Sequence, residues 1–224
     1  HNEEVLSQSV SQTSTLATNK LIRNTYTLLA MTLLFSAAAA GLSMYMNTPP
    51  MTYLISIGIA FLLIWFALPR TANSGAGLGV VFAITGLMGF AIGPMLNMYL
   101  QLPNGSSIIA TAMGGTGAIF IGLSAYALMS KKDFSFMGGF LMVGMLTVIV
   151  AAVANIFLQM PMFSVAISSV VILLMSGFIL FDTSRMVNQP HTANYIVMTV
   201  SLYLNIFNIF ISLLQILGVA GGDD

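Results

Sequence analysis

A carboxylate and a few side-chain amides are the polar groups that interrupt the most apolar stretches of this sequence. In SGFILFDTSRMV, Asp182 follows about twenty uncharged residues, and Arg185 comes three positions later. In SLYLNIFNIF, Asn205 and Asn208 are also three apart, which places both on one face of a helix. A carboxylate in such a setting needs hydrogen-bond donors, because an unpaired charge away from water is costly. These residues could therefore fasten helices together, or form part of a gate or conduit.

The sequence offers few side chains that could act as catalytic groups in an enzyme. A serine protease inside a membrane needs a His to activate its Ser, but His191 lies in the polar turn NQPHTAN. An aspartyl protease needs two carboxylates in one site, and Asp133 stands apart from Asp182, in a turn beside two lysines. The sequence has no Cys, so thiolate ligands and thiol nucleophiles are excluded. We expect a protein without catalytic activity, metal site or cofactor.

Composition places these residues in a lipid bilayer. Charged residues make up 5% of the 224 residues and hydrophobic residues 58%, whereas soluble domains carry roughly 25% charged residues. The net charge is zero and there is no basic tract, so nucleic acid is not an expected partner. The chain is predicted to be an all-α, polytopic membrane protein.

Apolar runs of spanning length indicate seven transmembrane helices, separated by turns rich in Pro, Gly and Asn. The predicted spans are Thr27–Met46, Thr52–Leu68, Leu78–Tyr99, Ile108–Met129, Phe136–Leu158, Phe163–Met186 and Ile196–Val219.

The basic residues predict the orientation of these spans. All six basic residues fall on the same side of the predicted bundle: Lys20, Arg23, Arg70, Lys131, Lys132 and Arg185. Because basic residues stay in the cytoplasm, the N-terminus is predicted to be cytoplasmic and the C-terminus periplasmic. The organisation is then a polar cytoplasmic tail (1–25), a seven-helix domain (26–219) and a short acidic periplasmic tail (220–224).

The polar N-terminal tail, NEEVLSQSVSQTSTLATN, contains too few apolar residues to fold by itself. We expect it to be unstructured. It is either an extension without a role or a cytoplasmic segment that a partner grips, beginning with Asn2, Glu3, Glu4, Val5 and Leu6.

Three groups could donate to Asp182, which is expected to stay ionised near the cytoplasmic edge. Arg185 lies on the same helix and would form an interfacial pair of little energetic weight. Arg70 could reach across the bundle from the end of the second span. Asn205 lies at a similar depth, because the last two spans run antiparallel from the same side. Helix packing alone and a gate or conduit both remain open as roles.

Four segments resemble the Bax inhibitor motif family of seven-span proteins: KKDFSFMGGFLMVG, AVANIF, ILFDTSRM and SLYLNIFNIFISLLQILG. The likeness extends from about Lys20 to Gly218. RNTYTLLAMTLLFSA and FAITGLMGFAIGPMLNMYL resemble most the gammaproteobacterial YccA branch, whose members reside in the bacterial inner membrane.

The resemblance implies six helices around a central seventh, and a calcium leak latched by two aspartates with an Arg nearby. Asp182 matches the first aspartate and Arg70 the Arg, but Asn205 stands where the second aspartate is expected. Two carboxylates can share a proton, whereas an amide simply donates to a carboxylate. We therefore expect no pH-gated calcium leak. The YccA branch implies instead a modulator that occupies FtsH, a membrane-anchored ATP-dependent protease, and slows its action on other substrates. A Ca2+ or cation leak gated near Asp182 is the alternative function.

Overall fold

The computed structural model describes residues 1–221, and these residues form helices and short connections. The helices are α1 (Asn2–Tyr45), α2 (Met51–Leu62), α3 (Leu68–Thr71), α4 (Ala76–Ala91), α5 (Gly93–Leu100), α6 (Gly105–Ser130), α7 (Gly138–Leu158), α8 (Pro161–Asn188) and α9 (Tyr195–Gly221). A π-helical turn, Leu63–Ala67, joins α2 to α3, and a 3-10 turn, Ser135–Met137, precedes α7. Together they form seven segments long and apolar enough to cross a membrane. The predicted all-α, seven-span fold is confirmed; the predicted acidic tail lies mostly outside the described residues.

Two of the spans are interrupted at a proline. Pro69 has no N–H to donate to the preceding turn, and just before it the Leu68 N–H reaches back five residues to the Leu63 carbonyl oxygen. Pro94 lies in the first turn of α5, and the helix of the third span breaks at Ile92. The predicted span Leu78–Tyr99 agrees with the observed segment Ala76–Leu100, but its helix is broken at Ile92, because the Pro94 ring cannot follow a regular helical turn.

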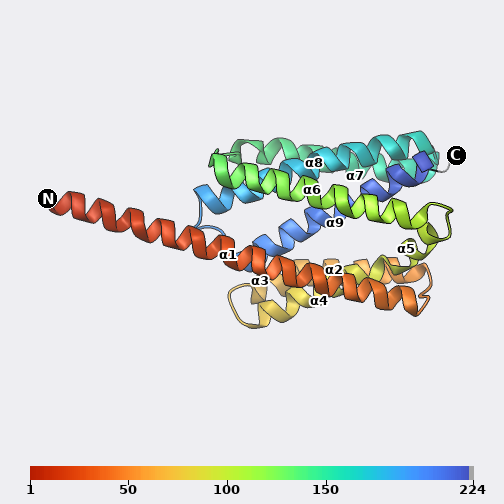
Figure 1. The fold of residues 1–224 in the computed structure, drawn as a ribbon, viewed down its shortest axis with the longest axis horizontal. Coiled ribbons are helices and arrows are strands. Elements are labelled where there is room, and N and C mark those ends of the chain that lie inside the picture. Colours follow the sequence, from red (N-terminus) through yellow and green to blue (C-terminus); the bar gives the residue numbers. More distant parts are fainter. Residues whose placement is uncertain (222–224) are drawn as a thin grey trace.

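The N-terminal segment differs from the prediction as well. Residues expected to be unstructured form the first turns of α1, which runs without interruption from Asn2 to Tyr45. No Gly or Pro occurs between Asn2 and Ala40, so a helix started by the apolar span can extend backwards at little cost per residue. Figure 1 shows this part of α1 projecting well beyond the bundle.

The helices form two layers with α9 between them. In the N-terminal layer, α1, α2, α4 and α5 pack against one another; in the C-terminal layer, α8 packs against both α6 and α7. Figure 1 shows α9 crossing obliquely from one layer to the other. It contacts α1 and α4 on one side and α6 and α8 on the other. The most apolar part of α9 is 56% buried, the largest share among the described spans, which confirms the predicted central seventh helix.

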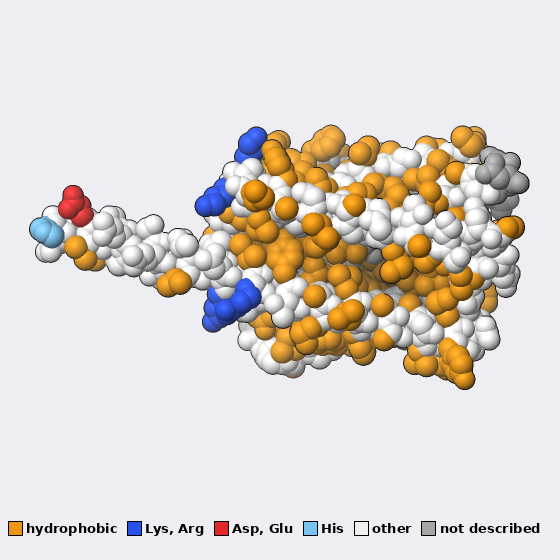
Figure 2. All heavy atoms as spheres, in the orientation of Figure 1, with side chains coloured by type: hydrophobic (Ala, Val, Ile, Leu, Met, Phe, Trp, Pro, Cys, Tyr) orange, Lys and Arg blue, Asp and Glu red, His pale blue; other side chains and the backbone are white. Residues whose placement is uncertain are grey.

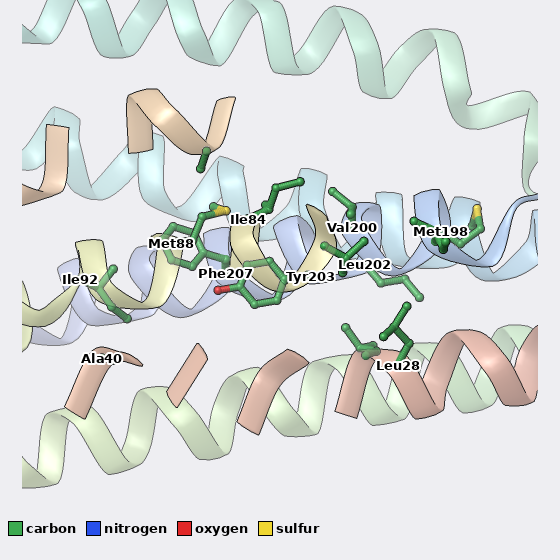
Figure 3. Packing of buried hydrophobic residues seen from close by; sticks show 14 of the residues in the cluster. Leu28, Ala40, Ile84, Met88, Ile92, Met198, Val200, Leu202, Tyr203 and Phe207 are labelled. Atoms are coloured by element: carbon green, nitrogen blue, oxygen red, sulfur yellow. The ribbon is translucent and has the colours of Figure 1, made fainter. Parts of the chain in front are cut away.

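Leu202, Tyr203 and Phe207 of α9 are buried in the main apolar core. Figure 3 shows them among residues contributed by the N-terminal layer, Leu28 and Ala40 of α1 and Ile84 and Met88 of α4. Gly89 permits the close approach of α1 and α4, since a side-chain carbon at this position would collide with the backbone and hydroxyl oxygen of Ser36. Gly89 thus lets α1 and α4 pack closely together, and α9 packs against both helices.

The basic residues gather where α1 leaves the bundle. Figure 2 shows Lys and Arg side chains at this end, whereas hydrophobic side chains cover much of the visible flank. We refer to this end as the basic end and to the other as the opposite end. The cytoplasmic orientation of the basic end stays a prediction.

Candidate functional site

The carboxylate of Asp182 is buried between α8 and α9, close to the basic end. Its Oδ2 accepts a hydrogen bond from the Ser201 hydroxyl at 2.5 Å and another from the Asn205 side-chain amide at 3.0 Å. Asp182 is only 3% exposed and Asn205 5% exposed. We call these three residues the Asp182 clamp. Hydrogen bonds to a carboxylate are stronger than those between neutral groups, so the clamp ties α8 to α9.

The connection between α8 and α9 brings these residues to the same depth. α8 ends at Asn188 and α9 begins at Tyr195, so the two helices run in opposite directions from a short turn. Ser201 and Asn205 are four residues apart, which aligns their side chains on the face of α9 towards α8. The spacing explains how two donors reach the same carboxylate oxygen.

Asn194 fixes the start of α9. Its side-chain oxygen accepts the backbone N–H groups of Ile196 at 2.9 Å and Val197 at 3.2 Å, which caps the helix. Its amide nitrogen donates to the Ala72 carbonyl at 3.0 Å and to the Asn73 side chain at 2.9 Å. The first turn of α9 is thereby attached to the connection that follows α3.

Other predicted site residues do not join the clamp. Arg185 places its guanidinium carbon 5.5 Å from the centre of the Phe181 ring, on the same helix. Arg70 is exposed in α3, and neither arginine is hydrogen-bonded to Asp182 within the described chain. The Asn208 amide donates instead to the Leu204 carbonyl of its own helix at 2.8 Å. A gate role for any of these residues stays a prediction.

Sequence reasoning missed Ser201. The signal was present, because Ser201 precedes Asn205 by one helical turn in SLYLN and so shares its face. A serine in an apolar span often bonds back to its own helix, which makes this residue type easy to overlook. Here it makes the shorter of the two bonds to the carboxylate.

Polar contacts near the clamp also join the two layers. The Tyr26 hydroxyl of α1 donates to the Ser124 hydroxyl of α6 at 3.1 Å and lies 3.5 Å from the Thr183 hydroxyl of α8. Between the two clamp donors on α9, the Tyr203 hydroxyl lies 2.5 Å from the Ser36 hydroxyl and donates to the Thr85 carbonyl at 3.3 Å. The contacts of Tyr26 and Ser36 bring α1 to helices that are far removed from it in sequence, and the Tyr203–Thr85 contact joins α9 to α4.

The opposite end is built differently. A groove of about 650 Å3 separates α2 and α5 from α8 and α9. Its walls are mostly apolar, with Met95, Met98 and Val165 among them, and the Ser164 hydroxyl and Gln215 amide add polar groups. The Ser168 hydroxyl donates to the Gln215 side-chain oxygen at 2.7 Å, which joins α8 to α9 here. Asp182 does not line this groove.

The geometry suits structural cohesion better than proton transfer. A single carboxylate meets two neutral donors, and an amide lacks the second acidic proton that a shared-proton pair requires. The clamp can therefore hold α8 and α9 together without a change of protonation. The cation leak implied by the resemblance stays a prediction.

Comparison with known proteins agrees with the sequence motifs. The family model described as inhibitor of apoptosis-promoting Bax1 matches residues 18–222. A membrane protein of Vibrio cholerae is 50% identical over 223 residues, covering 100% of both chains. A protein of Escherichia coli K12 is 47% identical over 222 residues, covering 99% of this chain and 100% of its own, and is named modulator of FtsH protease YccA.

A protein of Escherichia coli O6:H1 with the same 47% identity is named inner membrane protein YccA. The predicted inner-membrane location agrees with that name. The family model spans the whole seven-helix domain, and the relatives match along their full lengths. The chain therefore belongs to the Bax inhibitor family.

Proposed function

We propose that this protein is an inner-membrane modulator of an FtsH-type ATP-dependent protease, which it occupies as a slow, competing substrate. The near full-length similarity to the Escherichia coli modulator of FtsH protease supports this function. The structural observation that carries the proposal is the projecting start of α1, which offers the protease an accessible end (Figure 1). The proposal places this end on the cytoplasmic side.

The projecting segment is available to a partner. Asn2, Glu3 and Glu4 are exposed, and the apolar side chains of Val5 and Leu6 are 56% and 63% exposed. A short helix without tertiary contacts is marginally stable in water. Its first turns can therefore unfold at low cost and enter an unfolding machine. Being helical rather than unstructured does not prevent capture; it adds a small unfolding step.

The remainder of the chain resists extraction. Within the bundle, α1 packs along α4 and α9, and Thr32 and Leu29 are completely or almost completely buried. Unravelling α1 also breaks the Ser36–Tyr203 contact to α9. An easily captured end followed by a resistant bundle is the combination that would keep a protease engaged without rapid turnover.

The test is a competition in proteoliposomes that contain FtsH, a second membrane substrate and either the full chain or a chain lacking residues 2–16. We expect the full chain to lengthen the half-life of the second substrate several-fold, and the shortened chain to leave it unchanged. Equal protection by both chains would refute the role of the segment.

Two substitutions make the test sharper. Leu6→Pro keeps the length of the segment but breaks its helix, so it should compete at least as well as the parent if capture requires an unfolded end. Weaker competition by this variant would show that the protease recognises the helical form of the segment. Ser201→Ala with Asn205→Leu weakens the bundle, and this variant should be degraded faster and protect the second substrate for a shorter time.

A further inference from the structure

The basic end carries a patch of cations and aromatic rings. Its residues are Tyr126 of α6, Lys131, Lys132 and Phe134 of the following connection, Phe136 of the 3-10 turn, and Arg185 of α8. We call it the basic–aromatic patch. We propose that it binds the phosphate-bearing headgroup of an anionic phospholipid, a role that is separate from the protease modulation proposed above.

The connection that carries the patch is held firmly against α8. The Phe134 backbone N–H donates to the Ser184 hydroxyl at 2.8 Å, and the Asn188 amide donates to the Lys132 carbonyl at 3.2 Å. Arg185 lies between these two anchoring residues in sequence. The three cations are therefore displayed by one braced unit rather than by a loose loop.

Neutral aromatic partners position two of the cations. The Lys132 ammonium donates to the Tyr126 hydroxyl at 3.2 Å and lies 5.8 Å from the centre of its ring. The Arg185 guanidinium lies over Phe181, as described above. Contact with a neutral ring orients a cation but leaves its charge available to an anion.

One carboxylate faces this group. Asp133 accepts the Ser135 backbone N–H at 2.9 Å, and Ser135, through its side chain and backbone, holds the pKa of Asp133 below its usual range. Asp133 is thus ionised and offsets one of the three positive charges of Lys131, Lys132 and Arg185. The patch retains an excess of positive charge, to which an anionic headgroup is complementary.

The backbone at Lys131 is a second unusual feature. Lys131 ends α6 with φ 55° and ψ 18°, in the left-handed region where Gly or Asn is the common residue. A lysine is less favourable there, because its Cβ crowds the backbone. This left-handed residue ends α6 and starts the connection that carries the patch.

Apolar residues next to the patch favour a lipid as the source of the anion. The rings of Tyr126, Phe134 and Phe136 form a row, with centres 6.2 Å and 6.5 Å apart. Phe136 is 79% exposed, and Phe140, one turn into α7, is 75% exposed. Cations above an exposed aromatic and apolar flank fit a headgroup whose acyl chains continue down the side of the protein.

The experiment measures lipid retained by the purified full chain in mild detergent, by native mass spectrometry during titration with phosphatidylglycerol or phosphatidylcholine. We expect selective retention of phosphatidylglycerol. Lys132→Gln with Arg185→Gln should weaken it about 30-fold, at about fivefold for each cation removed. Lys20→Gln with Arg23→Gln is the matched control, since it removes two exposed cations of α1 at the same end, and should change retention less than threefold.

Lys132→Arg is the control for a purely structural effect. It keeps the positive charge and should retain phosphatidylglycerol like the parent. Loss of retention in Lys132→Arg, or equal losses in the two double variants, would overturn the proposal. So would equal retention of phosphatidylcholine, or displacement of the lipid by millimolar inorganic phosphate, which would indicate a site for free phosphate.

Discussion

The two ends of the bundle are held together by different forces. At the basic end, a buried carboxylate with two donors joins α8 to α9, and Tyr26 joins α1 to the C-terminal layer. At the opposite end, a groove of about 650 Å3 lies between the layers, and a hydrogen bond between the neutral side chains of Ser168 and Gln215 joins α8 to α9. Near its start, α9 is therefore held by hydrogen bonds to a buried carboxylate. Near its end, it is held by apolar packing and a weaker hydrogen bond between neutral side chains.

This difference has an energetic basis. Removing the donors of a buried charge leaves that charge uncompensated, which costs far more than losing a bond between neutral groups. Apolar burial contributes less at the groove, where the layers do not meet, than in the core around Tyr203. Substitutions of the same type should therefore have unequal effects at the two ends.

The largest effect is expected for Ser201→Ala with Asn205→Leu. The carboxylate of Asp182 loses both donors while it stays buried, and the free energy of unfolding should fall by about 3–6 kcal/mol, at about 1.5–3 kcal/mol for each hydrogen bond to a charged group. Reversible unfolding in mixed detergent micelles gives the measurement. Ser168→Ala at the opposite end is the control, with an expected loss of about 0.6 kcal/mol. Equal losses of unfolding free energy in the two variants would contradict the proposed difference between the two ends.

Two methionines test packing in the same way. Met88 is 3% exposed in the core and Met98 is 65% exposed beside the groove. Met88→Ala should lower the free energy of unfolding by about 2–5 kcal/mol because it leaves a cavity. Met98→Ala should change it by no more than about 0.5 kcal/mol. A comparable loss for Met98→Ala would mean that the groove is closed and packed in the bilayer.

Between pH 6 and 8, Asn205→Asp should make stability more dependent on pH than it is in the parent. Its new carboxylate would face Asp182 across the present 3.0 Å contact, and two buried carboxylates cannot both ionise readily. The folded variant then holds a proton that the unfolded chain releases, so its stability should fall as pH rises from about 6 to 8, by at most about 1.4 kcal/mol per pH unit. Melting curves for the two proteins that respond identically to pH would contradict this prediction.

The smallest effect is expected at Asp133, outside the spans. Because its pKa is lowered in the folded protein, its contribution to stability is present above the usual value of 3.8 and is lost as pH falls through the folded-state pKa. Asp133→Asn keeps an acceptor but removes the charge. Its melting temperature should lie slightly below that of the parent at neutral pH and converge with it in acid. A constant difference at all pH values would show that the charge of Asp133 is irrelevant.

The spans were predictable because hydropathy is summed over about twenty residues, so a few misleading positions do not matter. Asn205 was one of three donors considered for Asp182, because two antiparallel helices joined by a short turn bring the two residues to a similar depth, and the structure shows the bond between them. The contacts of Ser201 and Arg185 were harder to predict. A side chain near a helix end can contact its own backbone, an adjacent ring or a neighbouring helix. Only the packed arrangement decides that choice.

Local breaks were missed for a different reason. Pro94 lies within an apolar run. Proline lacks the backbone N–H that a continuous helix needs, but the hydropathy of the run is unaffected by that loss. The start of α1 was missed because polar composition indicates a lack of core-forming residues, not a lack of helix-forming ones. Ser, Thr and Gln can continue a helix that an adjoining span has already started.

The continuity of α1 has a mechanical consequence. A pull applied at Asn2 is carried along one unbroken rod to the segment that packs beside α4 and α9. This load acts parallel to the interfaces, so it shears many side-chain contacts at once instead of unzipping them one at a time. A motor that grips the chain from this terminus first unwinds the exposed turns, and the resistance then rises steeply where α1 enters the bundle.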